Sequence, residues 1–348
     1  LEGKLRRLAI VRGPRKYLEL VLRFIDGTDD RLVLMKDVLE IRRGLPTNAN
    51  DVFYLPSKYW TYAGEDANYL ILRGPGNKVV KVSKTYLRRL IRPDHLRESA
   101  YGVTTLPILR REDYVLWVDD LSKVTDPRTY EYVKWAEKLV EEEYRTSGGT
   151  KFAAIHESLE SSPSTWLRLP DTSGSLLLLR SAIHRNYSVW LNSVREAQVD
   201  KRLYLGYLRP EYEGKVSPEV VFAVANSVLT YLGVELMGRA NLGEGALDVE
   251  TVDYEAVPIV DPARLEESLR RAGRLDDLKA VVSRVLSLRP ANIEDEARRP
   301  ERMEMERLVL GPLGLSDDDV RELYKGLVEL ANLRTRRAES VRRQHYNA

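Results

Sequence analysis

The chain of 348 residues contains no cysteine. This absence excludes disulfide bonds, thiolate zinc sites and cysteine nucleophiles. It is typical of a reducing compartment, or of a thermophile that avoids oxidisable side chains, so we expect a cytoplasmic and thermophilic protein. Histidine is also rare, and the four histidines are too scattered to form a His-x-x-x-His pair, so the sequence does not predict a metal site.

The sequence also lacks any run of about 18 uncharged apolar residues. Its first residues do not show the basic, hydrophobic and small-residue succession of a signal peptide. We therefore expect neither a membrane span nor a secretory leader. The chain begins with Leu1 rather than methionine, so we expect either a piece of a longer protein or a chain whose start has been removed.

A phosphate-binding glycine loop is missing as well. The stretch GRANLGEGALD, residues 238–248, lacks the Lys and Ser/Thr of a P-loop, and Glu244 inside it would repel a phosphate. A dinucleotide fingerprint needs a preceding strand and a following helix, whereas here an apolar helix precedes and strand-like alternation follows. Carboxylate pairs such as Asp119 and Asp120 have the pattern of solvated charge. The sequence therefore predicts neither a nucleotide site nor a self-sufficient active site.

What the chain does have is arginine. The net charge is only +2, but residues 1–110 hold 21 Lys and Arg against 12 Asp and Glu, whereas residues 111–160 hold 7 against 12. About 40 of the 55 basic residues are arginine, the side chain suited to bidentate contact with phosphate and guanine. The same richness can also reflect genome composition or thermophily.

The apolar periodicity predicts an α+β fold rather than alternating βαβ units. We expect a β-rich domain over residues 1–262, with inserted helices near 127–145 and 217–238, followed by a small helical module over residues 263–348. Within the first domain, residues 5–38 alternate in short apolar runs and predict short strands around a turn.

Several element boundaries carry local signals. Residues 69–82 read as two strands joined by a Gly-Pro-Gly-Asn turn, and residues 164–210 as several antiparallel strands. A helix after Asp126 ends in a double glycine, and the helix over 217–238 is apolar on nearly all sides, so it should be buried. Ser316 and the acidic residues after it should cap the last helix.

Three segments, in this order, resemble a known family. They are EIRRGLPTNANDVFYLP at residues 40–56, GRANLGEGALDVETVDYEAVPIVDP at 238–262, and the closing LGLSDDDVRELYKGLVELANLRTRRAESVR. The first is similar to the R-x-G-x-x-T-x-x-N-x-x-F segment of TaqI-like, type II and type IIG adenine-specific DNA methyltransferases. The family also has a Y-V-K-W-A-E-K type helix and a V-P-I-x-D-P strand in these places. The resemblance covers about residues 40–345.

The chain departs from that family in one respect that matters for activity. Such enzymes bind S-adenosylmethionine in a glycine-containing strand-to-helix turn and hold a flipped adenine with an (Asn/Asp/Ser)-Pro-Pro-(Tyr/Phe/Trp) motif. Neither motif occurs here, and the sequence has no Pro-Pro pair. The resemblance therefore implies a target-recognition region without its catalytic domain. It implies no cofactor in this chain, double-stranded DNA as a partner, and a methyltransferase catalytic domain or subunit as a second partner.

A recognition region must neutralise phosphates and read base edges with a few fixed side chains. The loop over residues 42–56, the stretch KVSKTYLRRLIR and the glycine-rich loop supply suitable groups. The candidate DNA contacts are Arg42, Arg43, Thr47, Asn48 and Asn50 in the first, Lys81, Lys84, Arg88, Arg89 and Arg92 in the second, and Arg239 and Asn241 in the third. The alternatives are an asparagine-rich turn with ion-paired arginines, a solvated helix face, and a purely architectural glycine loop.

Two other functions fit the same sequence. One is a protein-interaction scaffold whose helical tail docks a catalytic partner and which has negligible affinity for DNA. The other is the specificity subunit of a type I restriction system, which would need two similar recognition halves separated by long helices. No such internal repeat is visible in the sequence.

Overall fold

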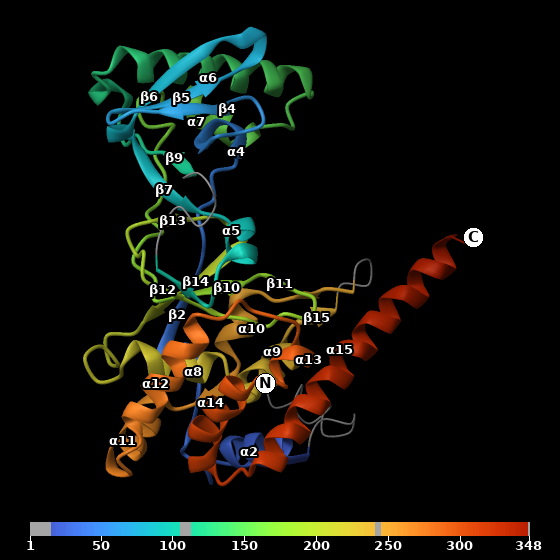
Figure 1. The fold of residues 1–348 in the computed structure, drawn as a ribbon. Coiled ribbons are helices and arrows are strands. Elements are labelled where there is room, and N and C mark those ends of the chain that lie inside the picture. The colour runs from blue at the N-terminus through green and yellow to red at the C-terminus, as the bar shows by residue number, and fades with distance from the viewer. Residues whose placement is uncertain (1–14, 105–112, 241–244, 347–348) are drawn as a thin grey trace.

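The computed structural model describes residues 15–104, 113–240 and 245–346, with side chains described as far as residue 338. Figure 1 shows a large lower body and a smaller upper lobe, joined by a narrow neck. Both parts combine helices with strands in several sheets, and the chain ends in a helical stretch. The α+β class predicted from the sequence is therefore confirmed.

Each part is built around its own hydrophobic core. Residues between 45 and 167 form the core of the upper lobe, whereas the core of the body draws mainly on residues 17–41 and 176–327. A third, smaller cluster of residues between 91 and 205 fills the neck. The upper lobe is thus inserted between two parts of the body in sequence. The chain also returns to the body between two strands of the lobe sheet, because residues 102–103 pair with residues 191–192 of the body.

The upper lobe and its connection to the neck contain two sheets and two long helices. Their order is β4-β5-β6 in one sheet and β13-β7-β9-β3 in the other. The elements are α4 (Asn50–Phe53), β3 (Tyr54–Leu55), β4 (Thr61–Glu65), β5 (Tyr69–Arg73), β6 (Val79–Ser83), β7 (Leu87–Ile91), α5 (Pro93–Glu98), β9 (Tyr114–Leu116), α6 (Pro127–Thr146), α7 (Ala153–Ser161) and β13 (Gln198–Val199).

Helix α6 covers one face of the three-stranded sheet, as its pattern predicted. The Asp126 carboxylate caps it by accepting from the Thr129 amide, and the stripe that includes Val133 and Val140 is fully buried. The Thr129 hydroxyl accepts from the Ser83 amide at 2.9 Å, which ties the helix to β6. The predicted turn between β5 and β6 is confirmed, with Gly76 at φ 64°.

The body is organised around a five-stranded sheet of order β2-β14-β10-β12-β8. Its strands and the short elements around them are α2 (Arg15–Ile25), β1 (Leu32–Leu34), α3 (Met35–Val38), β2 (Leu39–Arg43), β8 (Gly102–Val103), β10 (Leu177–Arg180), β11 (Ala182–Ile183), β12 (Trp190–Asn192), β14 (Leu203–Leu208), β15 (Arg239–Ala240), β16 (Leu247–Asp248), α10 (Thr251–Glu255) and β17 (Pro258–Val260).

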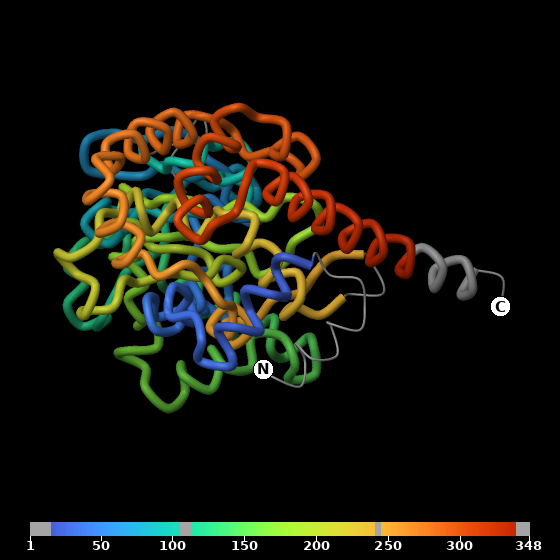
Figure 2. The backbone as a smooth tube through the Cα atoms, turned by 90° about the horizontal axis from the view of Figure 1, so that it is seen from below, coloured from blue at the N-terminus to red at the C-terminus, as the bar shows by residue number. Residues whose placement is uncertain are grey.

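Helices cover the lower side of this sheet. They are α8 (Pro218–Ala225), α9 (Val228–Met237), α11 (Pro262–Arg271), α12 (Leu275–Leu286), α13 (Ile293–Glu296), α14 (Pro300–Leu310) and α15 (Asp317–Tyr346). Seen from below, α15 runs out from the body beyond the rest of the chain (Figure 2). Ser316 and Asp319 cap it reciprocally, each side chain accepting from the amide of the other residue, which confirms the predicted start.

Several predicted elements differ from the structure. The strand-like stretch after the glycine-rich loop contains helix α10, Thr251–Glu255. Residues 15–25 form a helix instead of a strand, because Tyr17, Leu20 and Val21 fall on one helical face. The predicted single helix over 217–238 is buried, as expected, but it breaks into α8 and α9. The segment that starts at residue 81 forms strands, so the alternative of a solvated helix face is wrong.

The strands over 164–210 pair antiparallel between β10, β12 and β14, as predicted, although β12 and β13 also pair parallel with β8 and β7. The domain boundary at residue 262 stays a prediction, and the core of the body runs across this position. Among the described residues no single helix is long and apolar enough to cross a membrane; α8 and α9 meet that test only as a pair bent by 54°.

Candidate nucleic-acid interface

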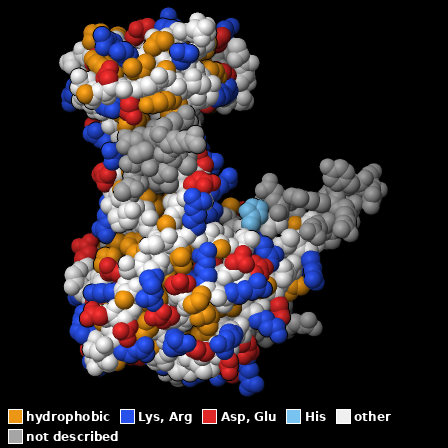
Figure 3. Space-filling view, in the orientation of Figure 1, with side chains coloured by type: hydrophobic (Ala, Val, Ile, Leu, Met, Phe, Trp, Pro, Cys, Tyr) orange, Lys and Arg blue, Asp and Glu red, His pale blue; other side chains and the backbone are white. Residues whose placement is uncertain are grey.

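The surface is hollowed between the upper lobe and the body. Figure 3 shows this notch on the side of the molecule towards which α15 projects, with Lys and Arg side chains along the edge of the neck. The neck end of the five-stranded sheet and α5 lie at this position (Figure 1). A groove that carries fixed positive charge is the feature expected of a surface that binds a phosphate backbone.

Three strands bring basic residues to the neck end of the sheet. Arg43 ends β2 opposite Tyr204, and Arg180 ends β10 opposite Leu203. The turn that leads into β14 carries Lys201 and Arg202, both exposed. Helix α5 adds the exposed Arg97, whose charge acts on Arg180. We call these residues the neck-end basic group: Arg43, Arg97, Arg180, Lys201 and Arg202.

Most of this group has no acidic partner. Only Arg202 forms an ion pair, with the fully buried carboxylate of Asp200 at 3.0 Å. Among the described residues no carboxylate lies within ion-pair distance of the other four side chains. Because no described carboxylate pairs with these four cations, we expect the neck end of the sheet to be a source of positive potential.

The neck itself is held together by a buried polar network. His95 Nε2 lies 3.0 Å from Asp113 Oδ2, and His95 Nδ1 accepts from the Arg92 amide at 3.3 Å. Since Nδ1 is an acceptor, the neutral ring donates from Nε2 to the carboxylate. Arg92 also pairs with Asp113 at 3.4 Å and lies over the ring of Tyr54. This network fixes α5 against the strands of the neck.

The predicted loop over residues 42–56 is only partly at the surface. Arg42 is exposed but pairs with Glu40 at 2.7 Å, and this hydrogen bond lowers the pKa of Glu40. Thr47 is fully buried and donates to Asn50. Because its hydroxyl is enclosed and already used, we withdraw Thr47 as a DNA contact. Asn48 is exposed, and its φ of 55° accounts for an asparagine at this position.

The second predicted strip is spread over two sheets. Lys81 pairs with Asp66 at 3.6 Å, and Lys84 pairs with Glu65 at 2.8 Å, where its hydrogen bond lowers the pKa of Glu65. Both lysines therefore belong to ion pairs of the upper lobe. Arg88 and Arg89 lie on β7 in the neck and are exposed; Arg89 is 3.9 Å from Glu196.

Two predicted residues meet at one pocket. Asn50 and Arg92 both line a polar pocket of about 300 Å³, together with Lys58 and Tyr54. Lys58 pairs with Asp51 at 2.7 Å. Asn50 of the first predicted segment and Arg92 of the second are therefore close in space. Their separation in sequence did not reveal this.

Two glycines of the glycine-rich loop, Gly238 and Gly245, have structural reasons for their identity. A Cβ at Gly238 would lie 2.7 Å from the Leu247 side chain, and Gly245 has φ 71°. Arg239 on β15 is exposed and pairs with Glu250 at 3.2 Å. Asn241, the other predicted contact in this loop, lies outside the described residues.

Sequence analysis missed four members of the neck-end basic group: Arg97, Arg180, Lys201 and Arg202. The segment LLLLR at 176–180 does carry a signal, because a charged residue ends a strand that is otherwise apolar. That pattern marks the end of a strand but does not tell which end of the sheet it reaches. Within the described part of the chain no group of three or more Asp, Glu or His side chains is placed to hold a metal ion.

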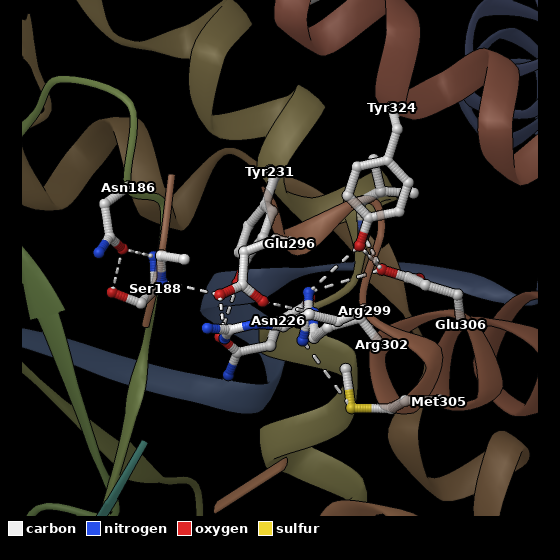
Figure 4. Close-up of polar contacts among 12 residues, drawn as sticks. Asn186, Ser188, Asn226, Tyr231, Glu296, Arg299, Arg302, Met305, Glu306 and Tyr324 are labelled. Carbon is white, nitrogen blue, oxygen red and sulfur yellow. Dashed lines mark hydrogen bonds and ion pairs between the residues drawn. The ribbon is translucent and has the colours of Figure 1, made fainter. Parts of the chain in front are cut away.

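A second polar cluster lies inside the body, away from the notch (Figure 4). Arg302 is fully buried, 3.3 Å from Glu296 and 3.7 Å from Glu306. It also donates to the backbone carbonyl of Asn226, at the break between α8 and α9. The cluster joins α13 and α14 to the break between α8 and α9, and its enclosure makes it a structural feature rather than a binding surface.

No protein-family model matches the chain, and no curated protein matches it. Among solved structures, the chain is similar to the type IIG restriction endonuclease BpuSI, with a TM-score of 0.54 at 13% sequence identity. The similarity covers 95% of this chain and 34% of that one, so the chain spans about a third of the length of BpuSI. The two proteins share a fold over this region.

Proposed function

We propose that this chain recognises double-stranded DNA as the specificity module of an adenine-specific methyltransferase or restriction-modification enzyme. The observation that carries this proposal is the fold similarity to BpuSI, a type IIG restriction endonuclease, over 95% of the chain. The three sequence segments that resemble the TaqI-like family support the same origin. The methyl-transferring domain, with its S-adenosylmethionine, then lies outside this chain, in the same polypeptide or in a separate subunit.

In this proposal the notch between lobe and body receives the duplex. The neck-end basic group contacts the phosphates, and these contacts fix the register of the protein on the duplex. Asn48, Asn50 and Arg88 are the remaining candidates for contact with base edges or with the flanking backbone. The candidates that would have to leave intramolecular ion pairs to contact DNA rank below these: Arg42, Lys81, Lys84, Arg89 and Arg239.

The test is the binding of the purified chain to a fluorescently labelled duplex over a salt series. A DNA-binding module should lose affinity steeply as salt rises, with a slope in log–log form of about 0.9 for each phosphate neutralised. We expect replacement of both Arg43 and Lys201 by glutamine to reduce that slope by about two. Arg321→Gln is the matched control, because Arg321 lies at the start of α15 and pairs with Asp318 at 2.6 Å.

A chain that binds no duplex even at low salt would overturn the proposal and favour a protein-interaction scaffold. Binding of S-adenosylmethionine by the isolated chain, followed in a titration calorimeter, would contradict the placement of the cofactor elsewhere. Selection of bound sequences from a random duplex pool then tests specificity, because a module that only contacts phosphates enriches no sequence.

A further inference from the structure

Arg180 has an unusual environment for a charged side chain. It ends β10, directly after the fully buried Leu177, Leu178 and Leu179. Its guanidinium carbon lies 4.6 Å from the ring centroid of Trp190, a fully buried residue on the adjacent strand β12. A guanidinium stacked on an indole is held in one orientation, and the stacking adds about 1 kcal/mol of attraction.

The backbone that carries Arg180 is fixed on both sides. The Tyr254 hydroxyl donates to the Arg180 carbonyl oxygen at 2.9 Å, and Arg180 is in register with Leu203 on β14. The next residue, Ser181, donates from its hydroxyl to the carbonyl of Arg202 at 2.8 Å. The position of the guanidinium is thus set before any ligand arrives, which reduces the entropy lost on binding.

The same guanidinium lacks a counter-ion. Its Nε is enclosed and has no hydrogen-bond partner, and no described residue pairs with its terminal nitrogens. Burial lowers the pKa of Arg180, and the positive charge of nearby Arg97 lowers it further; Tyr254 and Tyr101 act in the opposite direction. A guanidinium nevertheless keeps its proton in proteins. The enclosed Arg180 guanidinium is therefore a partly buried cation that no described carboxylate neutralises, an arrangement that an anion would relieve.

We propose that Arg180 and Arg97 form a binding site for one phosphate group of the DNA backbone. The planar guanidinium offers two parallel N–H donors that match two oxygens of a phosphodiester. Arg97 is exposed on α5, next to Leu96, which belongs to the same apolar cluster as Trp190, and it would supply the second cation. The site lies at the same end of the sheet as Arg43 and Lys201. This inference rests on the proposed DNA-binding function and deepens it by naming the anchoring point.

The site is tested with Arg180→Met, which keeps a long apolar stem against Trp190 but removes the charge. In the duplex salt series we expect the slope for Arg180→Met to fall by about one, with a loss of affinity that is the same for every duplex sequence. Arg180→Lys keeps the charge and should retain the slope. Arg321→Gln should behave as the wild type. A well-folded Arg180→Met that keeps the full slope overturns the site.

Inorganic phosphate presents the same chemistry without a duplex, so a second arm separates the two sources. Melting temperatures are compared in sodium phosphate and sodium chloride at equal ionic strength, for the wild type and Arg180→Met. Protection by phosphate in the wild type alone, with an unchanged duplex slope in the variant, shows a site for a free anion and overturns the assignment to DNA. If the wild type binds no duplex at any salt concentration, the proposed function fails, and the phosphate arm alone decides whether Arg180 holds an anion.

Discussion

At the level of single residues, the buried Glu306 should give the protein a measurable pH dependence. Burial raises the pKa of Glu306 from its ordinary 4.5 to about 7, although Arg302, the Tyr324 hydroxyl and the Val228 amide act to lower it. Between these two values the native state holds a proton that the unfolded chain has released. The free energy of unfolding should therefore fall as pH rises through this range and level off above about 7.

Denaturant titrations across this pH range test the prediction, with Glu306→Gln as the comparison. Glutamine cannot ionise but can still accept from the Val228 amide, which lies 2.8 Å from Glu306 Oε1. The variant should lack the part of the pH dependence that comes from residue 306. An equal decrease in both proteins would show that another group is responsible.

A close approach of two backbone segments explains why residue 44 is glycine. A Cβ at this position would lie 2.6 Å from the Val199 carbonyl oxygen and still closer to that of Asp200. Gly44→Ala should therefore push β2 away from the strands of the neck and cost roughly 1–3 kcal/mol in the free energy of unfolding. Gly311→Ala is the matched control, because its Cβ would meet nothing within 4 Å and its φ of −55° is helical. Thermal melts showing equal stability for the two variants would refute this explanation.

At the level of elements, the break between α8 and α9 depends on Asn226. This fully buried side chain accepts from the Val189 amide at 3.1 Å and the Tyr231 hydroxyl at 2.7 Å, and it donates to the carbonyls of Val189 and Phe222. Asn226→Ala removes four buried hydrogen bonds and leaves the Val189 amide without its acceptor, so we expect a loss of about 2–5 kcal/mol in the free energy of unfolding.

Asn292→Ala is the control for this variant, since Asn292 is exposed at the start of α13 and makes no side-chain capping bond. Denaturant titration should show a change of less than about 0.5 kcal/mol for the control. A similarly small change for Asn226→Ala would mean that water or relaxation of the helices replaces the lost hydrogen bonds.

The sequence predicted those elements whose ends carry local chemical signals. Asp126, Ser316 and the turn at residues 74–77 were placed correctly, because caps and tight turns depend on side chains next to them in sequence. The break at Asn226 was missed, because both helices are apolar on all sides and no change of period marks it.

The candidate site was harder to predict than the elements, because charge alone does not show which cations are available. Arg42 and Lys84 are as basic in sequence as Arg43, yet Glu40 and Glu65 neutralise them. Arg42 pairs with Glu40, which lies two residues earlier on the same strand. Lys84 pairs with Glu65, which comes close only because β4, β5 and β6 lie side by side in one sheet. Arg180 differs from the other arginines in its contact with the Trp190 ring. That contact exists because β10 and β12 are neighbours in the sheet. Such neighbours arise from tertiary structure and are invisible to local patterns.

At the level of the whole molecule, the arrangement of the hydrophobic cores determines how freely the upper lobe can move relative to the body. The upper lobe and the body bury separate apolar clusters, and the chain links them through a narrow neck with a small cluster of its own (Figure 1). Few apolar contacts therefore oppose a change in the angle between lobe and body. A duplex that contacts both sides of the notch would reduce that freedom, at a cost in entropy that the phosphate contacts must offset.

Because the cores are separate, we also predict that the upper lobe and the body can each unfold locally while the other stays folded. Val140 is fully buried in α6 of the lobe, and Val282 is fully buried in α12 of the body. Truncation of either to alanine leaves a cavity that should cost roughly 1–3 kcal/mol. Hydrogen exchange followed by mass spectrometry should show faster exchange confined to the lobe, residues 45–90 and 114–167, in Val140→Ala and confined to the body in Val282→Ala. If either variant loses protection equally on both sides of the neck, the lobe and the body unfold as one cooperative unit. The contacts in the neck would then couple the stability of the two parts.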